Sequence, residues 1–127
     1  QYWPDARRFE MVTLPYQDFA TMNASLEVLE EIGHAAVAAR IASLADHLVR
    51  RAEEIGLMVV TPTDPARRAG IVAVRPSDPA ATAERLTAAG VVFSLREGAI
   101  RLSPHVFTPV EHIDRAMDLI RAGHSAG

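Results

Sequence analysis

The sequence contains no cysteine and no lysine, and all 13 basic residues among its 127 are arginine. Without cysteine the chain has no disulfide, no thiolate nucleophile and no cysteine-ligated zinc or iron–sulfur site. Without lysine it cannot form a Schiff base to a carbonyl cofactor by itself. Any chemistry of this chain must therefore come from other groups.

Long apolar runs and an excess of positive charge are absent as well. The net charge is −3 and no basic run could follow a phosphate backbone, so we expect no nucleic-acid partner. No apolar run has membrane-spanning length and no signal peptide opens the chain, so we expect no membrane partner and a cytoplasmic location. Because the first residue is Gln1 and not Met, we also expect a processed product or a piece of something longer.

What the sequence does contain is a regular alternation of helical and strand patterns. The pair Glu97-Gly98 is typical of a β-hairpin turn, and Ser77 or Asp78 can cap a helix that has Pro79 at its first position. The expected helices are residues 18–32, 34–55, 79–89 and a last one from Pro109, and the expected strands are 57–60, 69–74, 91–95 and 99–102. This order predicts one α+β domain.

The beginning of the chain has a different character. Residues 1–16 mix aromatic side chains with two prolines and show neither a helical nor a strand period. We expect residues 1–16 to be an extended segment that lies against another surface, because its aromatic side chains have little to pack against otherwise. Residues 17–127 are then expected to form the α+β domain.

Metal and phosphate sites find little support. The chain has five histidines, but no two of them stand at metal-ligand spacing with a carboxylate on one helix, so we expect no metal site. His47 lies among charges on a predicted helix and is expected to be a solvated surface residue, whereas His105 follows a predicted strand in a loop. The glycine-rich phosphate-binding patterns GxGxxG and GxxxxGK do not occur.

Arg96 and Arg101 are the most notable polar residues, because each ends or interrupts an apolar strand beside a turn. A guanidinium held on a rigid strand can bind a carboxylate through two parallel hydrogen bonds. The alternative is that both are edge-strand charges that keep a sheet from aggregating. Residue type alone leaves both interpretations open.

The same region carries a resemblance to a known family. Residues 96–105 (REGAIRLSPH) and 111–115 (EHIDR) resemble the C-terminal signature of the class V aminotransferases. These are pyridoxal-phosphate enzymes related to cysteine desulfurases, selenocysteine lyases and isopenicillin N epimerases. Residues 8–15 (RFEMVTLP) resemble the family's RFExGTxP segment, and 24–33 resemble its next helix.

The resemblance implies the small C-terminal domain of a larger fold-type I enzyme, with a short, mostly antiparallel sheet packed on helices. The pyridoxal 5'-phosphate and its Schiff-base lysine are then expected in a large domain of the same polypeptide, against which residues 1–16 would lie, or against a partner subunit. The resemblance also implies a homodimer and an amino-acid substrate. This chain alone, without any lysine, is expected to be inactive.

Three residues inherit expected roles from the resemblance. Arg101 matches the position that pairs with the substrate's α-carboxylate, and Arg96 matches a second arginine near the substrate in some relatives. Thr13 matches a threonine that reaches the cofactor phosphate of the neighbouring subunit. Transamination, epimerisation and carbon–sulfur β-lysis all stay open, whereas a persulfide-forming desulfurase is disfavoured because the cysteine-bearing loop is missing. A non-catalytic α+β binding or dimerisation module derived from this fold is the alternative.

Overall fold

A computed structural model describes residues 2–9 and 14–124 of the chain. The chain divides into two compact units, Gln1–His34 and Ala35–Gly127. The expected boundary at residue 16 coincides with the beginning of the first α-helix at Tyr16. The grouping of residues 17–34 with the rest of the domain stays a prediction.

The first unit consists of a short 3₁₀ turn, η1 (Ala6–Phe9), and helix α1 (Tyr16–Ile32). Helix α1 ends where predicted, because Gly33 adopts a φ of +91° and its N–H donates to the carbonyls of Leu29 and Glu30. Neither η1 nor α1 contains a buried residue. The segment expected to be extended therefore includes one local turn, and α1 has no apolar partner within its own unit.

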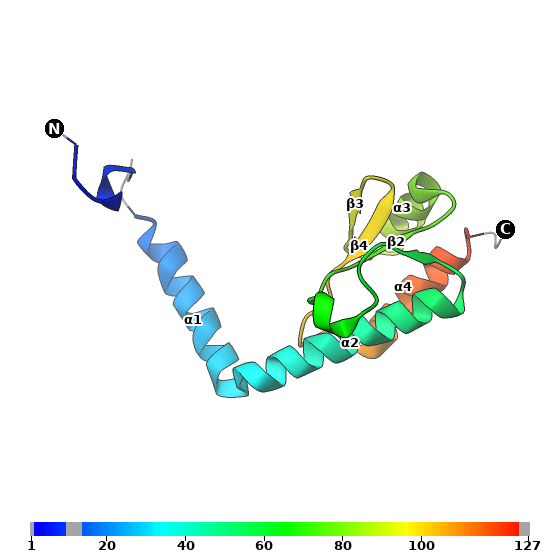
Figure 1. Ribbon diagram of the computed structural model, residues 1–127, viewed down its shortest axis with the longest axis horizontal. Helices are drawn as coiled ribbons and strands as arrows, with labels where there is room; N and C mark the ends of the chain where they lie inside the picture. The colour runs from blue at the N-terminus through cyan, green and yellow to red at the C-terminus, as the bar shows by residue number, and fades with distance from the viewer. Residues whose placement is uncertain (1, 10–13, 125–127) are drawn as a thin grey trace. The chain divides into compact units, whose positions relative to one another are not determined.

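The second unit contains the remaining elements in the predicted order (Figure 1). They are α2 (His34–Glu54, whose first residue belongs to the first unit), β1 (Met58–Val59), η2 (Pro65–Arg67), β2 (Val72–Arg75), α3 (Pro79–Ala88), β3 (Ser94–Arg96), β4 (Ala99–Leu102) and α4 (Val110–Arg121). The four strands form one antiparallel sheet in the order β1-β2-β4-β3. The predicted α+β architecture with a short antiparallel sheet is confirmed.

The strands expected from residues 57, 69 and 91 begin at Met58, Val72 and Ser94, and the ends of helices help to explain the first and the third of these differences. The N–H of Leu57 donates to the carbonyl of Ala52 at the end of α2, and the N–H of Val91 donates to that of Leu86 at the end of α3. These backbone groups complete helix ends and are not available to the sheet. The hairpin turn itself is as predicted, with positive φ at both Glu97 and Gly98.

The core lies between one face of the sheet and three helices. Val72 and Val74 of β2 and Ile100 and Leu102 of β4 point into it. They meet side chains of α2, α3 and α4, chiefly Leu44, Leu48, Leu86, Ile113, Met117 and Ile120. Because side chains alternate along a strand, Ala73 of β2 and Arg101 of β4 lie on the opposite face of the sheet. No helix of the second unit covers this second face, which we call the open face.

Among the described residues, no helix combines the length and the apolar character that crossing a membrane requires.

Candidate functional site

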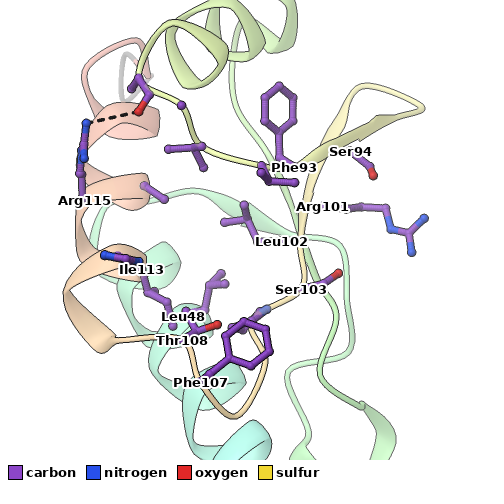
Figure 2. A pocket seen from close by; sticks show the side chains of 17 residues that line it. Leu48, Phe93, Ser94, Arg101, Leu102, Ser103, Phe107, Thr108, Ile113 and Arg115 are labelled. Carbon is purple, nitrogen blue, oxygen red and sulfur yellow. Dashed lines mark hydrogen bonds between the residues drawn. The ribbon is translucent and has the colours of Figure 1, made fainter. Parts of the chain in front are cut away.

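Arg101 lies in the middle of the open face. Its strand β4 is interior, because Arg101 pairs with Ala73 of β2 on one side and with Ser94 of β3 on the other. The interpretation of Arg101 as an edge-strand charge is therefore wrong. Its side chain is half-buried and, as Figure 2 shows, points away from Leu102 and Ile113. A rigid strand thus holds this guanidinium on the side of the sheet that no helix covers.

Arg96 stands on the same face but at the sheet edge. It pairs with Ala99, which is two residues from Arg101 along β4 and therefore shares its face. The side chain of Arg96 is exposed, and β3 is the outermost strand, so the edge-strand interpretation still fits this residue. The structure places the two predicted substrate-binding arginines at diagonal positions on neighbouring strands. Thr13, the predicted cofactor contact, lies outside the described residues.

A third arginine shares the open face, and sequence reasoning missed it. Arg75 is two residues beyond Ala73, the partner of Arg101, so it points to the same side of the sheet. One of its Nη atoms is 3.5 Å from the carbonyl oxygen of Glu97. The alternation Val-Ala-Val-Arg over residues 72–75 could have shown which face Arg75 occupies. The pairing of β2 with β4 could not be read from sequence, because α3 and β3 intervene.

The arginines of the open face are not paired with carboxylates of the described residues. Arg75, Arg96 and Arg101 form no ion pair with any carboxylate in the part of the chain that the structure describes. Other arginines are used within the fold: Arg68 pairs with Asp46, and Arg51 lies against three carboxylates. The open face therefore presents guanidinium groups whose donors are available to a ligand.

A hollow of about 510 Å³ opens between the loop that follows α3, the end of β4 and the beginning of α4 (Figure 2). Its wall is mainly apolar, with Leu48, Phe93, Leu102, Phe107 and Ile113 among the lining residues, and none of the lining residues is acidic. Such a hollow can hold an apolar group.

Hydrogen bonds of Thr108 fix the loop that forms one side of this hollow, residues 103–109, and the N–H of Thr108 donates to the carbonyl of His105 at 2.8 Å. The hydroxyl of Thr108 accepts from the N–H of His105 at 2.9 Å, and the carbonyl of Thr108 accepts from Arg40 of α2 at 3.2 Å. The ring of His105 lies 4.9 Å from that of Phe107, centroid to centroid. The loop thus connects the strand that carries Arg101 to α4 in one defined shape.

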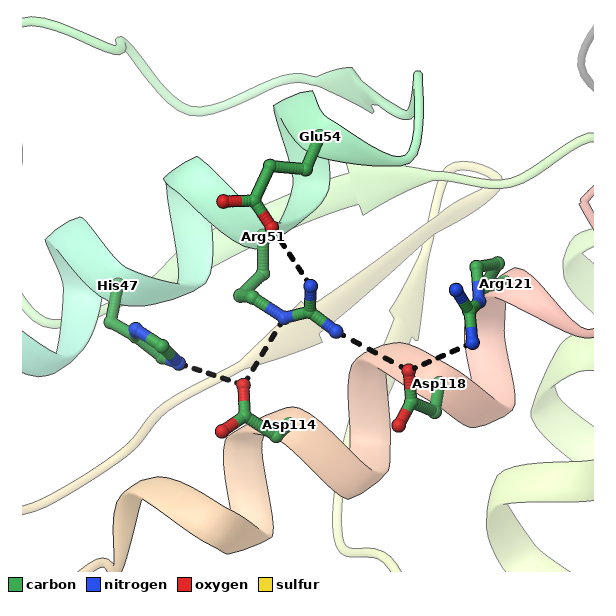
Figure 3. A network of polar contacts seen from close by, with 6 residues as sticks. All are labelled: His47, Arg51, Glu54, Asp114, Asp118 and Arg121. Atoms are coloured by element: carbon green, nitrogen blue, oxygen red, sulfur yellow. Dashed lines mark hydrogen bonds and ion pairs between the residues drawn. The ribbon is translucent and has the colours of Figure 1, made fainter.

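His47 is not the solvated surface residue that the sequence predicts. Its side chain is 24% exposed and its Nε2 lies 2.8 Å from Oδ1 of Asp114 on α4 (Figure 3). Sequence could not reveal this contact, because the two residues are brought together only by the packing of α2 on α4.

Arg51 continues this polar contact between the two helices. It lies 2.8 Å from Glu54, 3.1 Å from Asp114 and 3.3 Å from Asp118, and Arg121 approaches Asp118 in turn (Figure 3). The hydrogen bond to Glu54 raises the pKa of Arg51 most, and the charges of Glu54, Asp114 and Asp118 add to it while desolvation opposes it. The network connects α2 to α4 and has the character of a structural contact, not of a reactive site. No cluster of three potential metal ligands occurs in residues 2–9 and 14–124.

The sequence matches the model of a known protein family. Residues 37–120 match the family model described as the kynureninase C-terminal domain. The kynureninase of Xanthomonas euvesicatoria pv. vesicatoria (strain 85-10) is 32% identical over 109 residues, which are 80% of this chain and 26% of that protein. The kynureninase of Xanthomonas axonopodis pv. citri (strain 306) is 33% identical over 110 residues, with the same coverage. The chain thus spans about a quarter of the length of these relatives.

Solved structures show the same fold. An apo cysteine desulfurase from Thermococcus onnurineus NA1 superposes with a TM-score of 0.82 at 17% identity, covering 92% of this chain and 33% of that protein. A NifS-like protein superposes with a TM-score of 0.61 at 21% identity, covering 80% of this chain and 30% of that one. These likenesses confirm the predicted fold, that of the small C-terminal domain of the fold-type I enzymes.

Proposed function

The chain belongs to the kynureninase C-terminal domain family, and on this premise we propose that it is the small domain of a pyridoxal-phosphate-dependent enzyme acting on an amino acid. The family match over residues 37–120 and the 32–33% identity to two kynureninases support the enzyme class. Because the chain spans only 26% of those relatives, a large domain of the same polypeptide would supply the rest of the active site.

Arg101 carries the proposal. It is a half-buried guanidinium on an interior strand, and no carboxylate among the described residues pairs with it. Fork-shaped hydrogen bonding to a carboxylate fits this arrangement, because the strand fixes the side chain's origin and the planar guanidinium fixes the carboxylate's plane. We assign Arg101 to the α-carboxylate of the substrate, which it would hold in one orientation.

Nothing in this chain can bind the cofactor covalently, because the sequence has no lysine. When bound in the large domain, pyridoxal phosphate supplies an electron sink for the charge that develops at the substrate's α-carbon. This chain's own residues contribute binding and orientation: Arg101 at the α-carboxylate, Arg96 nearby, and the hydroxyl of Thr13 as a donor to the cofactor phosphate of a neighbouring subunit. The chain alone would accordingly be inactive.

The first unit supports a large-domain or second-subunit partner. Trp3, Phe9, Phe19 and Met22 are each at least 43% exposed, and no residue of η1 or α1 is buried. Apolar side chains gathered in this way mark an interaction surface. A homodimer in which this segment lies against the large domain or the second subunit would cover them.

Substitution of Arg101 by glutamine in the full-length protein tests the proposal. The change removes a charge-assisted pair of hydrogen bonds, so KM for the amino acid should rise about tenfold to a hundredfold while the cofactor's visible absorption band persists. Arg50→Gln is the matched control, because Arg50 is exposed on α2 and its side chain makes no hydrogen bond or ion pair among the described residues.

Two results would contradict the proposal. An unchanged KM in Arg101→Gln would remove the assignment of the α-carboxylate. A colourless full-length protein that takes up no added cofactor would favour the alternative of a non-catalytic binding module.

A further inference from the structure

The loop between β4 and α4, residues 103–109, contains a turn closed by two reciprocal hydrogen bonds. The N–H of Thr108 donates to the carbonyl of His105 at 2.8 Å, and the N–H of His105 donates to the hydroxyl of Thr108 at 2.9 Å. The first bond is the one that closes a β-turn, and the second uses the side chain of Thr108. The shape of this turn therefore depends on one hydroxyl as well as on backbone groups.

Both ends of the loop are held close to the same place on α2. At its end, an Nη atom of Arg40 donates to the carbonyl of Thr108 at 3.2 Å. At its beginning, the backbone of Gly70 approaches both Ile41 of α2 and Pro104. A methyl group added at Gly70 would come within 2.5 Å of Cγ2 of Ile41 and within 3.8 Å of the carbonyl oxygen of Pro104. Two neighbouring residues of α2 thus fix where the loop lies.

The contact of Arg40 with the loop is not part of an ion pair. The side chain of Arg40 is half-buried and pairs with no carboxylate of residues 2–9 and 14–124, where the carbonyl of Thr108 is its one hydrogen-bond partner. A cation close to the N-terminus of α4, which begins at Val110, is electrostatically unfavourable. We therefore expect the contact to add little stability, and its main consequence is the position of the loop.

The loop shares the hollow with Arg101. Ser103, Phe107 and Thr108 line this hollow together with Arg101 (Figure 2). The interior strand β4 fixes where the side chain of Arg101 begins, but a long side chain keeps rotamer freedom beyond that point. The surface beside it limits this freedom, and the loop is part of that surface.

We propose that Arg40 and Thr108 are positioning residues of the substrate site, which hold residues 103–109 in the shape that lets Arg101 bind the α-carboxylate in one orientation. They act through the loop, because the hydroxyl of Thr108 is bonded to His105 and the guanidinium of Arg40 to Thr108. A displacement of about 1 Å is enough to weaken an oriented contact of this kind. The proposal rests on the proposed function for the role of Arg101.

Thr108→Val in the full-length protein removes the hydroxyl and keeps the shape of the side chain. KM for the amino acid should rise about threefold to tenfold while kcat changes less than about twofold and the cofactor's absorption band persists. Arg40→Gln should act in the same way, and Thr108→Ser and Arg40→Lys should restore KM. Thr87→Val and Arg50→Gln are the matched controls, because both residues are exposed and their side chains make no hydrogen bond among the described residues.

A double-mutant cycle shows whether Thr108 acts through Arg101. Thr108→Val should change KM less than about twofold when Arg101→Gln is already present, because the contact that it positions is then gone. Equal effects of Thr108→Val in both backgrounds would overturn the inference. A lower unfolding midpoint of Thr108→Val with an unchanged KM would also overturn it, since that result would show a purely structural role.

A signal from the 127-residue chain separates this inference from the function on which it rests. The Nε–Hε resonance of Arg101 in NMR should move in Thr108→Val and in Arg40→Gln and stay in place in Thr87→Val. If Arg101→Gln raises KM but Thr108→Val does not, the proposed function stands and the inference is wrong. If Arg101→Gln leaves KM unchanged while the Arg101 resonance moves in both loop variants, the proposed function is wrong and the positioning of Arg101 by the loop stands.

Discussion

The two units both contain apolar side chains at helical spacing, but they use them differently. In helix α4 of the second unit, Ile113, Met117 and Ile120 are at most 4% exposed and belong to one continuous core. In helix α1 of the first unit, Phe19, Met22 and Leu26 are 43–49% exposed. The same kind of sequence pattern therefore leads to burial only where strands and other helices provide the opposing surface.

The ion pairs of the two units also differ, in their exposure and in how far apart the paired residues are in sequence. In the first unit Arg7 binds Asp5, only two residues away, and both side chains are about half exposed. In the second unit Arg68 reaches Asp46 across the fold with a side chain that is 5% exposed. The second unit is thus held by contacts between distant parts of the chain, whereas the polar contacts of the first unit are local among its described residues, 2–9 and 14–34. This supports the proposal that the first unit needs a large domain or a second subunit.

The largest expected effect is on the free energy of unfolding, when a leucine is replaced by alanine in each unit. Leu48→Ala removes a fully buried side chain from the core and should lower the free energy of unfolding by about 2–5 kcal/mol. Leu26→Ala, at a position 45% exposed in α1, should change it by less than about 0.5 kcal/mol. Urea denaturation followed by circular dichroism measures both. A comparable loss in both variants would mean that α1 belongs to the cooperative core.

A smaller difference is expected from removing one carboxylate in each unit. Asp46→Asn leaves the buried guanidinium of Arg68 with carbonyl partners at Pro62 and Thr63 but without a counter-charge. Because Asp46 itself is 37% exposed, we expect a loss of about 1–3 kcal/mol in unfolding free energy, at or below the lower end of the range for buried pairs. Asp5→Asn is the control and should have no measurable effect. Equal unfolding midpoints for the two variants would contradict the contrast.

The elements of the fold could be predicted from sequence because their signals are local. Gly33, Asp78 with Pro79, and Glu97-Gly98 each fix a helix end or a turn through the backbone of a few neighbouring residues. Strand limits were less predictable, because Val91 looks like a strand residue by type but completes the end of α3. Whether Val91 joins a strand or completes a helix end is decided by the three-dimensional packing, which the residue type does not reveal.

In the candidate site too, the residues that could be predicted are those whose neighbours are close in sequence. Arg96 and Arg101 could be found because the hairpin that joins their strands is local in sequence. Arg75 could not, because its proximity to Arg101 depends on the pairing of β2 with β4, two strands separated by α3 and β3. The contact of His47 with Asp114 was missed for the same reason: the two residues are 67 positions apart.

The smallest expected effect is confined to the first unit. Hydrogen bonds from the side chain of Arg7, and then from its backbone N–H, hold the pKa of Asp5 below its ordinary value. A lowered carboxyl pKa means that the ion pair is fully present above the ordinary value and is lost as the pH falls through the lowered one. Carboxyl-carbon NMR titration should show this shift, and Arg7→Gln should abolish most of it. Arg8→Gln should not, because only the backbone N–H of Arg8 contacts Asp5, at its carbonyl.

Since the ion pair of Arg7 with Asp5 is exposed and local, neither variant should move the unfolding midpoint of the chain. A shift of that midpoint in Arg7→Gln alone would show that the first unit shares in the cooperative fold.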